Sequence, residues 1–308
     1  MGLQFRFFGS FWIPQKSGWI YISPMLYLFW MTRPVNALIA MVSVWIGGWI
    51  AGAVLKGPWL WLEGLAMGLL AALGNLHNDW VDREVDRINR PERPLPSGKI
   101  SPQALGWTIG ILLACVLALG VYLGVPHLLF FVSVAGLLYF YNKVFKGLPL
   151  FGNFAVALLC ASALMLPTIE PRLWGEDSQP WVLVPLAFFS LLFTSIRELI
   201  KDIEDVPGDR AAGLTTFPVL LGVAPSRSLV QWCLVASVFS PGIPVALGIF
   251  PKVFLLASVA LVIPPILMAL FFVHSSHENW RKAQKMLKLA MVGGLFATAI
   301  TWKGLQFI

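Results

Sequence analysis

Residues 60–80 read LWLEGLAMGLLAALGNLHNDW, and the chain continues as VDREVDRINRPERPLPSGK to residue 99. The first stretch is an apolar run long enough to cross a hydrocarbon core of ~30 Å as a helix. The second stretch is dense in acidic and basic residues. A long apolar helix that ends abruptly in charged residues predicts a membrane span that emerges at one membrane face.

The rest of the chain has the same apolar character. Of its 308 residues, 58% are hydrophobic and only 12% are charged, against roughly 25% in a soluble domain, and its mean hydropathy is +0.77. We therefore predict an all-α integral membrane protein, a single domain over residues 1–308 with nine transmembrane helices in a bundle around a central cavity. The expected spans are 34–55, 60–80, 102–124, 126–142, 150–168, 181–201, 225–247, 251–272 and 286–305.

The basic residues predict an orientation. The net charge of +7 would suggest a nucleic-acid partner in a soluble protein, but here the cations lie in short loops between apolar segments. Cytoplasmic loops carry the excess of Lys and Arg. Placing the N-terminus and the charged mouth of the bundle in the cytoplasm, across the plasma membrane, leaves only four cations outside: Lys56, Arg172, Lys252 and Lys303. We predict membrane lipid as the surroundings and no nucleic acid as a partner.

Most of the 15 acidic residues fall in two windows, 79–92 and 198–209, each at the end of an apolar segment. The two windows have the same internal spacing, because Asp79, Asp82 and Asp86 correspond to Asp202, Asp205 and Asp209 at one offset. The matching spacing predicts an internal repeat, about 34–142 and 150–272, that contributes a charged site twice. Coincidence is the alternative.

In the first window, Asn78, Asp82 and Asp86 recur every four residues and therefore line one helix face, with Asp79 beside them. Adjacent carboxylates at a membrane boundary are tolerable when a cation lies between them. Mg²⁺ takes oxygen ligands, usually one or two protein carboxylates together with phosphate oxygens of a substrate. The pattern indicates a Mg²⁺–diphosphate site. A solvated helix end paired with neighbouring arginines is the alternative.

The second window carries another acidic face, formed by Glu198, Asp202, Asp205 and Asp209. We expect Pro207 and Gly208 to break this helix, which would place Asp209 in the following loop. Arg197 and Lys201 lie on an adjacent face, where they would hold phosphate oxygens or neutralise the acids. A structural network of ion pairs is the alternative.

Two such motifs predict two Mg²⁺ ions that bridge one diphosphate. The predicted metal ligands are Asn78, Asp79, Asp82, Asp86, Asp202, Asp205 and Asp209, of which Asp82, Asp86, Asp205 and Asp209 are the predicted catalytic residues. A cation transporter is an alternative of another class, since duplicated acidic helices also mark ion pathways. The acids cluster at one membrane face rather than at the midplane, which favours an enzyme.

The segments NDWVDREVD (78–86) and KDIEDVPGDR (201–210), with the proline-rich continuation from Arg87 to Lys99, resemble the UbiA superfamily of membrane prenyltransferases over essentially the whole chain. The resemblance implies transfer of a polyprenyl group, with geranylgeranyl diphosphate as the favoured donor. It is strongest to the branch that prenylates the hydroxyl of geranylgeranylglyceryl phosphate in ether-lipid synthesis. An aromatic or quinone precursor, or a chlorophyllide, is the alternative acceptor.

The resemblance also implies substrate-binding roles for polar residues near the cytoplasmic helix ends. Tyr139 and Lys143, with Lys146 close by, would contact the diphosphate, and so would Arg93 and Lys99 in the loop after the first motif. Asn36 would face the site, and Arg33 would meet an anionic acceptor. Ordinary anchoring of basic residues at the membrane boundary is the alternative for these cations. Asn153 is either a polar site residue or a helix cap.

Overall fold

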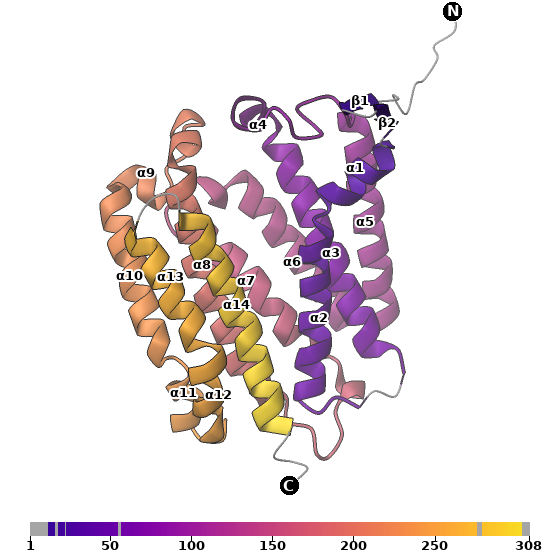
Figure 1. Cartoon of the computed structure of the whole chain (residues 1–308). Coiled ribbons are helices and arrows are strands. Elements are labelled where there is room, and N and C mark those ends of the chain that lie inside the picture. The colour runs from indigo at the N-terminus through magenta and orange to yellow at the C-terminus, as the bar shows by residue number, and fades with distance from the viewer. Residues whose placement is uncertain (1–11, 16–17, 22, 55–56, 276–278, 304–308) are drawn as a thin grey trace, which may run out of the picture. The chain divides into compact units, whose positions relative to one another are not determined.

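The protein, shown as a computed structural model in Figure 1, is described for residues 12–15, 18–21, 23–54, 57–275 and 279–303. Within these ranges the strands form one short antiparallel hairpin, β1 (Trp12–Gln15) and β2 (Gly18–Tyr21). Everything else that is regular is helical. The α-helices are α1 (Pro24–Met31), α2 (Pro34–Ile50), α3 (Trp59–Val81), α4 (Arg83–Asn89), α5 (Pro102–Leu123), α6 (Val125–Lys143), α7 (Phe151–Met165), α8 (Leu183–Ala211), α9 (Phe217–Leu221), α10 (Val223–Phe239), α11 (Gly242–Ala246), α12 (Val253–Leu261), α13 (Ile263–Ser275) and α14 (Trp280–Thr298). Short helical turns are η1 (Phe145–Gly147), η2 (Leu166–Ile169), η3 (Pro171–Leu173), η4 (Pro180–Val182) and the π-helical η6 (Ala299–Lys303).

The predicted multi-pass helical fold is confirmed. Among the described residues, seven helices are long and apolar enough to cross a membrane, or eight if the bent pair α1 and α2 is one span. The count of nine is not confirmed by this measure. The remaining predicted span corresponds to α14, whose first half carries the cations Arg281, Lys282, Lys285 and Lys288 and is therefore too polar to qualify. The N-terminal residues 1–11 and 16–17, on which the predicted orientation partly rests, lie outside the described residues.

The chain divides into two compact units. Unit 1 comprises Met1–Met41 and Gly64–Asn142, and unit 2 comprises Val42–Glu63 and Lys143–Ile308. The last of the three division points, between Asn142 and Lys143, falls close to the boundary between the halves of the predicted internal repeat. The repeat itself stays a prediction.

In unit 1, α3 is the central element because its small residues allow other helices to approach closely. A Cβ on Gly68 would lie 2.4 Å from the Met41 side chain of α2, and a Cβ on Gly74 would lie 2.8 Å from Leu138 of α6. Glycine at a helix contact permits this proximity in the same way as in other membrane bundles. The end of α3 is thereby held firmly among its neighbours.

In unit 2, α8 is the central element. Its buried residues, including Phe193, Leu199 and Ile200, form a continuous apolar core with α7, α10, α12, α13 and α14. Figure 1 shows α13 and α14 running side by side, and their contacts agree with this view. A helix that is apolar on most sides is expected to be buried within a bundle. The acidic residues of α8 are therefore carried at the end of a rigid helix.

The start of α7 depends on a close backbone approach at Gly152. A Cβ at this position would lie 2.8 Å from the carbonyl oxygen of Phe145, a distance that side chains do not adopt. Gly136, in the middle of α6, has nothing within 4 Å of such a Cβ. The two glycines thus form a matched pair, one constrained by packing and one not.

We expect Gly152→Ala to destabilise the protein by roughly 1–3 kcal/mol, because the backbone around η1 must shift to admit the methyl group. Gly136→Ala should be neutral or stabilising, since alanine has the higher helix propensity. Thermal unfolding of both variants in detergent measures the difference. An unchanged midpoint for Gly152→Ala would contradict the close approach.

Candidate active site

The connection between α1 and α2 directs a cation onto the first acidic cluster, which we define as Asn78, Asp79, Asp82 and Asp86. Arg33 lies in this connection, where the two helices meet at 47°. Its φ of 52° is unusual for a residue with a side chain and costs about 1–2 kcal/mol. The following Pro34 disfavours a right-handed helical conformation there.

Arg33 makes two contacts from this position. One guanidinium nitrogen lies 3.0 Å from Oδ1 of Asp79, and the other donates to Oδ1 of Asn75 at 3.3 Å. Asn75 in turn donates to the carbonyl oxygen of Thr32 at 2.9 Å, which ties the bend to α3. Arg33 is thus ion-paired with Asp79, an acid of the first cluster.

The predicted acidic helix face continues across the boundary between α3 and α4. Asp82 occupies the junction with helical dihedral angles, φ −78° and ψ 0°. Its amide donates to the carbonyl oxygen of Asn78 at 2.9 Å, and the amide of Asp86 donates to that of Asp82 at 2.7 Å. The side chains follow the same register, because Nδ2 of Asn78 donates to Oδ2 of Asp82 at 2.9 Å. These three residues therefore lie on one face, as the spacing predicts.

The proline-rich loop after α4 brings a second cation to the cluster. Nη1 of Arg93 lies 2.6 Å from Oδ2 of Asp86 and 3.6 Å from Oδ1 of Asp79. The loop is anchored because Leu95 and Ile100 are buried in the apolar core of unit 1. Arg93 therefore bridges two carboxylates of the first cluster from an anchored loop.

Other predicted residues of this region occupy more peripheral positions. Lys99 lies over the ring of Tyr27, 5.5 Å from its centroid. Tyr139, near the end of α6, is exposed and stacks on His77 at 5.7 Å, while His77 is hydrogen-bonded to the buried Asn142 at 2.9 Å. Asn36 is an exposed residue of the first turn of α2.

The second acidic cluster consists of Glu198, Asp202, Asp205 and Asp209, and all four residues lie on α8. Our expectation that Pro207 and Gly208 end this helix is wrong, because α8 continues through both residues to Ala211. An internal proline costs ~3 kcal/mol through one lost hydrogen bond and a steric clash. The packing of the neighbouring Ile203 in the core and the contacts around Asp209 offset that cost.

Two of these acids are held by neutral donors within unit 2. Nδ2 of Asn153, a buried residue of α7, donates to Oδ2 of Asp202 at 2.7 Å. Oγ1 of Thr216 donates to Oδ2 of Asp209 at 3.2 Å. The N-cap position of α7 is Leu150, so Asn153 is not a helix cap. Asn153 instead orients a carboxylate of the cluster.

Several basic residues were also predicted to lie near the second acidic cluster. Arg197 forms an ion pair with the adjacent Glu198, and Nζ of Lys201 lies 3.8 Å from the other oxygen of the same carboxylate. Lys146, in η1, acts electrostatically on Asp209. Lys143 is exposed at the end of α6. Arg197, Lys201 and Lys146 therefore act on acids of this cluster within unit 2.

Two positioning residues, Asn75 and Thr216, were given no role from the sequence, and for Asn153 the sequence left a site residue and a helix cap as alternatives. Asn75 and Asn153 are amides in apolar helices. Such a residue stands out in the sequence, but the spacing of residues does not predict which side chain it will contact. Thr216 lies beyond α8, where nothing in the sequence distinguishes it from other threonines of that loop. Each of them contacts an acidic or basic residue only through the tertiary fold.

The oxygen donors of both clusters suit a hard divalent cation. Among the residues that the structure describes, no group of three His, Cys, Asp or Glu side chains converges as a complete metal cage. Mg²⁺ usually binds one or two protein carboxylates and completes its shell with substrate phosphate and water. Asp82, with its amide partner Asn78, and Asp202, with Asn153, are fitting ligands of this kind.

The apolar helices, the two aspartate-rich clusters and the family match together identify a membrane enzyme of the prenyltransferase class. The chain belongs to the UbiA prenyltransferase family, whose profile matches residues 19–292. It is 37% identical to the digeranylgeranylglyceryl phosphate synthase of Methanothermobacter thermautotrophicus, over 77% of this chain and 79% of the relative. It is 34% identical to the synthase of the same name from Methanopyrus kandleri, over 87% of this chain and 96% of the relative.

Solved structures show the same fold. A structure of digeranylgeranylglyceryl phosphate synthase has a TM-score of 0.71 at 28% identity, covering 91% of this chain and 98% of its own. A UbiA homologue from Archaeoglobus fulgidus, bound to GPP and Mg²⁺, has a TM-score of 0.61 at 18% identity, covering 88% of this chain and 99% of its own. At that identity the second likeness concerns the fold alone.

Proposed function

We propose that the protein transfers a geranylgeranyl group from geranylgeranyl diphosphate to the hydroxyl of geranylgeranylglyceryl phosphate in ether-lipid biosynthesis. The bond between C1 of the prenyl chain and the diphosphate oxygen breaks, and an ether bond forms between C1 and the acceptor oxygen. The acceptor hydroxyl loses its proton, and diphosphate leaves. The proposal rests on the relatives from Methanothermobacter thermautotrophicus and Methanopyrus kandleri. Both are named digeranylgeranylglyceryl phosphate synthase, and this chain matches most of the length of each.

The acids of the two clusters would hold two divalent ions on the diphosphate of the substrate. When bound, Mg²⁺ neutralises charge on the leaving diphosphate and so favours cleavage of the C1–O bond. We propose Asp82, Asp86, Asp205 and Asp209 as the catalytic carboxylates, with Asn78, Asp79 and Asp202 completing the ligand set. The oxygen chemistry of these side chains supports this assignment.

The cations around the clusters would bind the diphosphate oxygens. Arg93 already contacts Asp86 and Asp79, so its guanidinium is positioned to exchange a carboxylate for a phosphate oxygen. We assign the same role to Lys99, Lys143, Lys146 and Lys201, with Tyr139 as a hydroxyl donor and Asn36 as a polar neighbour. Apolar residues around the prenyl chain would keep water from the reacting carbon.

The membrane arrangement follows from the same proposal. We propose that α14 is the ninth span, with its four leading cations at the cytoplasmic surface and its apolar remainder in the bilayer. The bundle would enclose a central cavity for the prenyl chain. The N-terminus and the mouth of the site would face the cytoplasm across the plasma membrane.

The test is a transfer assay with purified protein, labelled geranylgeranyl diphosphate and a panel of acceptors. We expect label in digeranylgeranylglyceryl phosphate when geranylgeranylglyceryl phosphate and Mg²⁺ are present, and none after chelation with EDTA. Label in a prenylated aromatic acid, quinone precursor or chlorophyllide, with none in ether lipid, would reject the proposed acceptor. Flux of Mg²⁺ into liposomes without prenyl transfer would reject the enzyme.

The hydrogen bond from Asn153 to Asp202 leads to a prediction about the Mg²⁺ concentration that the enzyme requires. Loss of a residue that orients a metal ligand typically weakens metal binding 10–100-fold. We therefore expect Asn153→Ala to raise the Mg²⁺ concentration for half-maximal transfer by about 10-fold or more. Ser195→Ala is the control, because within the described part of the chain the Ser195 hydroxyl donates only to the carbonyl oxygen of Leu191 in its own helix. Equal Mg²⁺ requirements in both variants would contradict a role for Asn153.

A further inference from the structure

One face of α8 packs against α14 in three layers that differ in chemistry. The first layer, at the ends nearest the acidic cluster, is an ordinary polar contact. Nε of Arg281 lies 2.6 Å from one oxygen of Glu204, and Nε2 of Gln284 donates to the other at 3.0 Å. The carboxylate of Glu204 is therefore balanced by partners from α14.

The second layer holds two cations, Arg197 and Lys288, that act on the carboxylate of Glu198. Arg197 lies seven residues before Glu204, which places it on the same face of α8. Lys288 lies four residues after Gln284 on α14, and its charge acts on Arg197 and on Glu198. Within the described residues the Lys288 ammonium forms no ion pair or hydrogen bond, and the two oxygens of the Glu198 carboxylate face Arg197 and Lys201. Together with Lys201, three cations surround one buried carboxylate.

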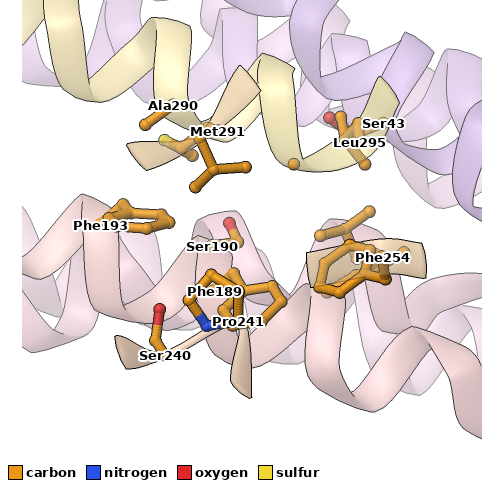
Figure 2. Close-up of a pocket in the computed structure, with 14 residues that line it drawn as sticks. Ser43, Phe189, Ser190, Phe193, Ser240, Pro241, Phe254, Ala290, Met291 and Leu295 are labelled. Carbon is orange, nitrogen blue, oxygen red and sulfur yellow. The ribbon is translucent and has the colours of Figure 1, made fainter. Parts of the chain in front are cut away.

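The third layer is an apolar cavity inside unit 2. Figure 2 shows Ala290, Met291 and Leu295 of α14 on one side of it, with Phe189, Ser190 and Phe193 of α8 on the opposite side. Phe193 precedes Arg197 by one turn, and Met291 follows Lys288 by three residues. The cavity therefore opens one helical turn from the two cations, on the same faces of the same helices.

An excess of positive charge beside an apolar cavity matches an anionic head group on a hydrocarbon chain. We infer that Arg197 and Lys288 bind the phosphate of the acceptor lipid, a phosphomonoester with an isoprenoid chain whose first part enters the cavity. This inference rests on the proposed function and specifies how the acceptor is recognised. It assigns to this pair the anionic contact that the sequence had suggested for Arg33.

The geometry separates this site from the diphosphate. Asp202 lies five residues beyond Arg197, which is about 7–8 Å along the helix axis at 1.5 Å per residue. Five residues also turn the helix by about 140°, so Asp202 lies on a different face from Arg197. A glycerol unit is short enough to span such an axial distance between a phosphate and a reacting hydroxyl. Arg33, by contrast, lies beside Asp79 of the first cluster and donates to Asn75.

The size of the cavity limits what it holds. Its volume is about 50 Å³, well below the roughly 300–1,000 Å³ of pockets that enclose a whole small molecule. Only the part of the chain next to the glycerol would enter it. The exposed apolar side chains of α14, such as Leu289, Val292 and Phe296, would contact the remainder of the chain or the lipid.

The experiment compares two acceptors that differ only in the phosphate: geranylgeranylglyceryl phosphate and geranylgeranylglycerol. For the wild-type protein we expect a much lower KM for the phosphorylated acceptor. In Arg197→Gln and in Lys288→Gln that KM should rise about 10-fold or more. In Lys288→Gln the KM for geranylgeranyl diphosphate and the transfer to geranylgeranylglycerol should stay near wild type. Lys288→Arg should retain the preference. Lys285→Gln, a loss of charge one turn away at an exposed position, is the control.

Each other outcome decides a different point. A wild-type protein that prenylates neither acceptor would reject the proposed function itself. Active variants in which the KM for geranylgeranyl diphosphate rises would assign the cations to the donor and overturn the inference. Equal losses with both acceptors would indicate a structural role and also overturn it.

Discussion

Alanine at Asp205 or at Asp82 is expected to lower kcat/KM for prenyl transfer by about 10²–10³-fold while leaving the protein folded. Each carboxylate is proposed to hold a divalent ion that stabilises charge developing on the leaving diphosphate, and losing one such electrostatic group typically costs about 10²–10³ in rate. The two residues lie in different units, at the ends of α3 and α8. Single-turnover transfer of labelled geranylgeranyl diphosphate, measured across a range of Mg²⁺ concentrations, gives the size of each loss.

The double variant distinguishes one shared site from two separate ones. If both clusters bind the same diphosphate, the variant lacking both carboxylates should be scarcely worse than either single variant, because groups that act as a unit are not additive. Multiplicative losses would indicate independent sites. Asp177→Ala is the control, because it removes one exposed carboxylate from the loop between η3 and η4. Near-normal turnover in Asp205→Ala would reject the assigned role.

The helical architecture was predictable because membrane-spanning helices require long apolar runs, which are visible in the sequence. Every predicted span has a helix close to its expected range, including α3 for 60–80 and α8 for 181–201. The count was less accessible, since α14 mixes a cationic start with an apolar remainder and α1 and α2 meet at a bend. A window of hydropathy averages over both features and therefore cannot resolve them.

The error at Pro207 has a physical explanation. A local rule assigns a helix end to a Pro-Gly pair, but propensity is a weak prior that tertiary contacts override. Here the preceding turn is buried through Ile203, and the following turn is tied down through the bond between Asp209 and Thr216. Neither contact is visible from the spacing of residues along the chain. The consequence is that Asp209 stays on a rigid helix instead of a loop.

The acidic face of the first cluster was predictable for the opposite reason. A repeat of four residues encodes a helix face directly, and Asn78, Asp82 and Asp86 keep that register across the junction of α3 and α4. Partners contributed by other segments were not encoded in this way. Arg33 and Arg93 reach the same acids from a bend and from a loop, so their pairings depend on tertiary structure.

The ion pair between Arg93 and Asp86 makes the second large prediction. Asp86 is 6% exposed and its carboxylate lies 2.6 Å from Nη1 of Arg93. Removing one partner of a buried pair leaves an uncompensated charge and typically costs about 3–5 kcal/mol. We expect Arg93→Gln to be destabilised by about that amount and to lose prenyl transfer. Thermal unfolding in detergent and the transfer assay measure the two effects separately.

Neutralising both partners should separate stability from catalysis. In Arg93→Gln/Asp86→Asn no charge is left unpaired between these two positions, so most of the stability should return, because a neutral pair avoids the desolvation cost of an isolated ion. Activity should stay lost, since Asp86 is proposed to hold a metal ion and an amide is a weaker ligand. Arg93→Lys keeps the charge and should lie between wild type and Arg93→Gln. A double variant as unstable as Arg93→Gln would show that Arg93 stabilises the fold through a partner other than Asp86, whereas an active double variant would remove Asp86 from the catalytic set.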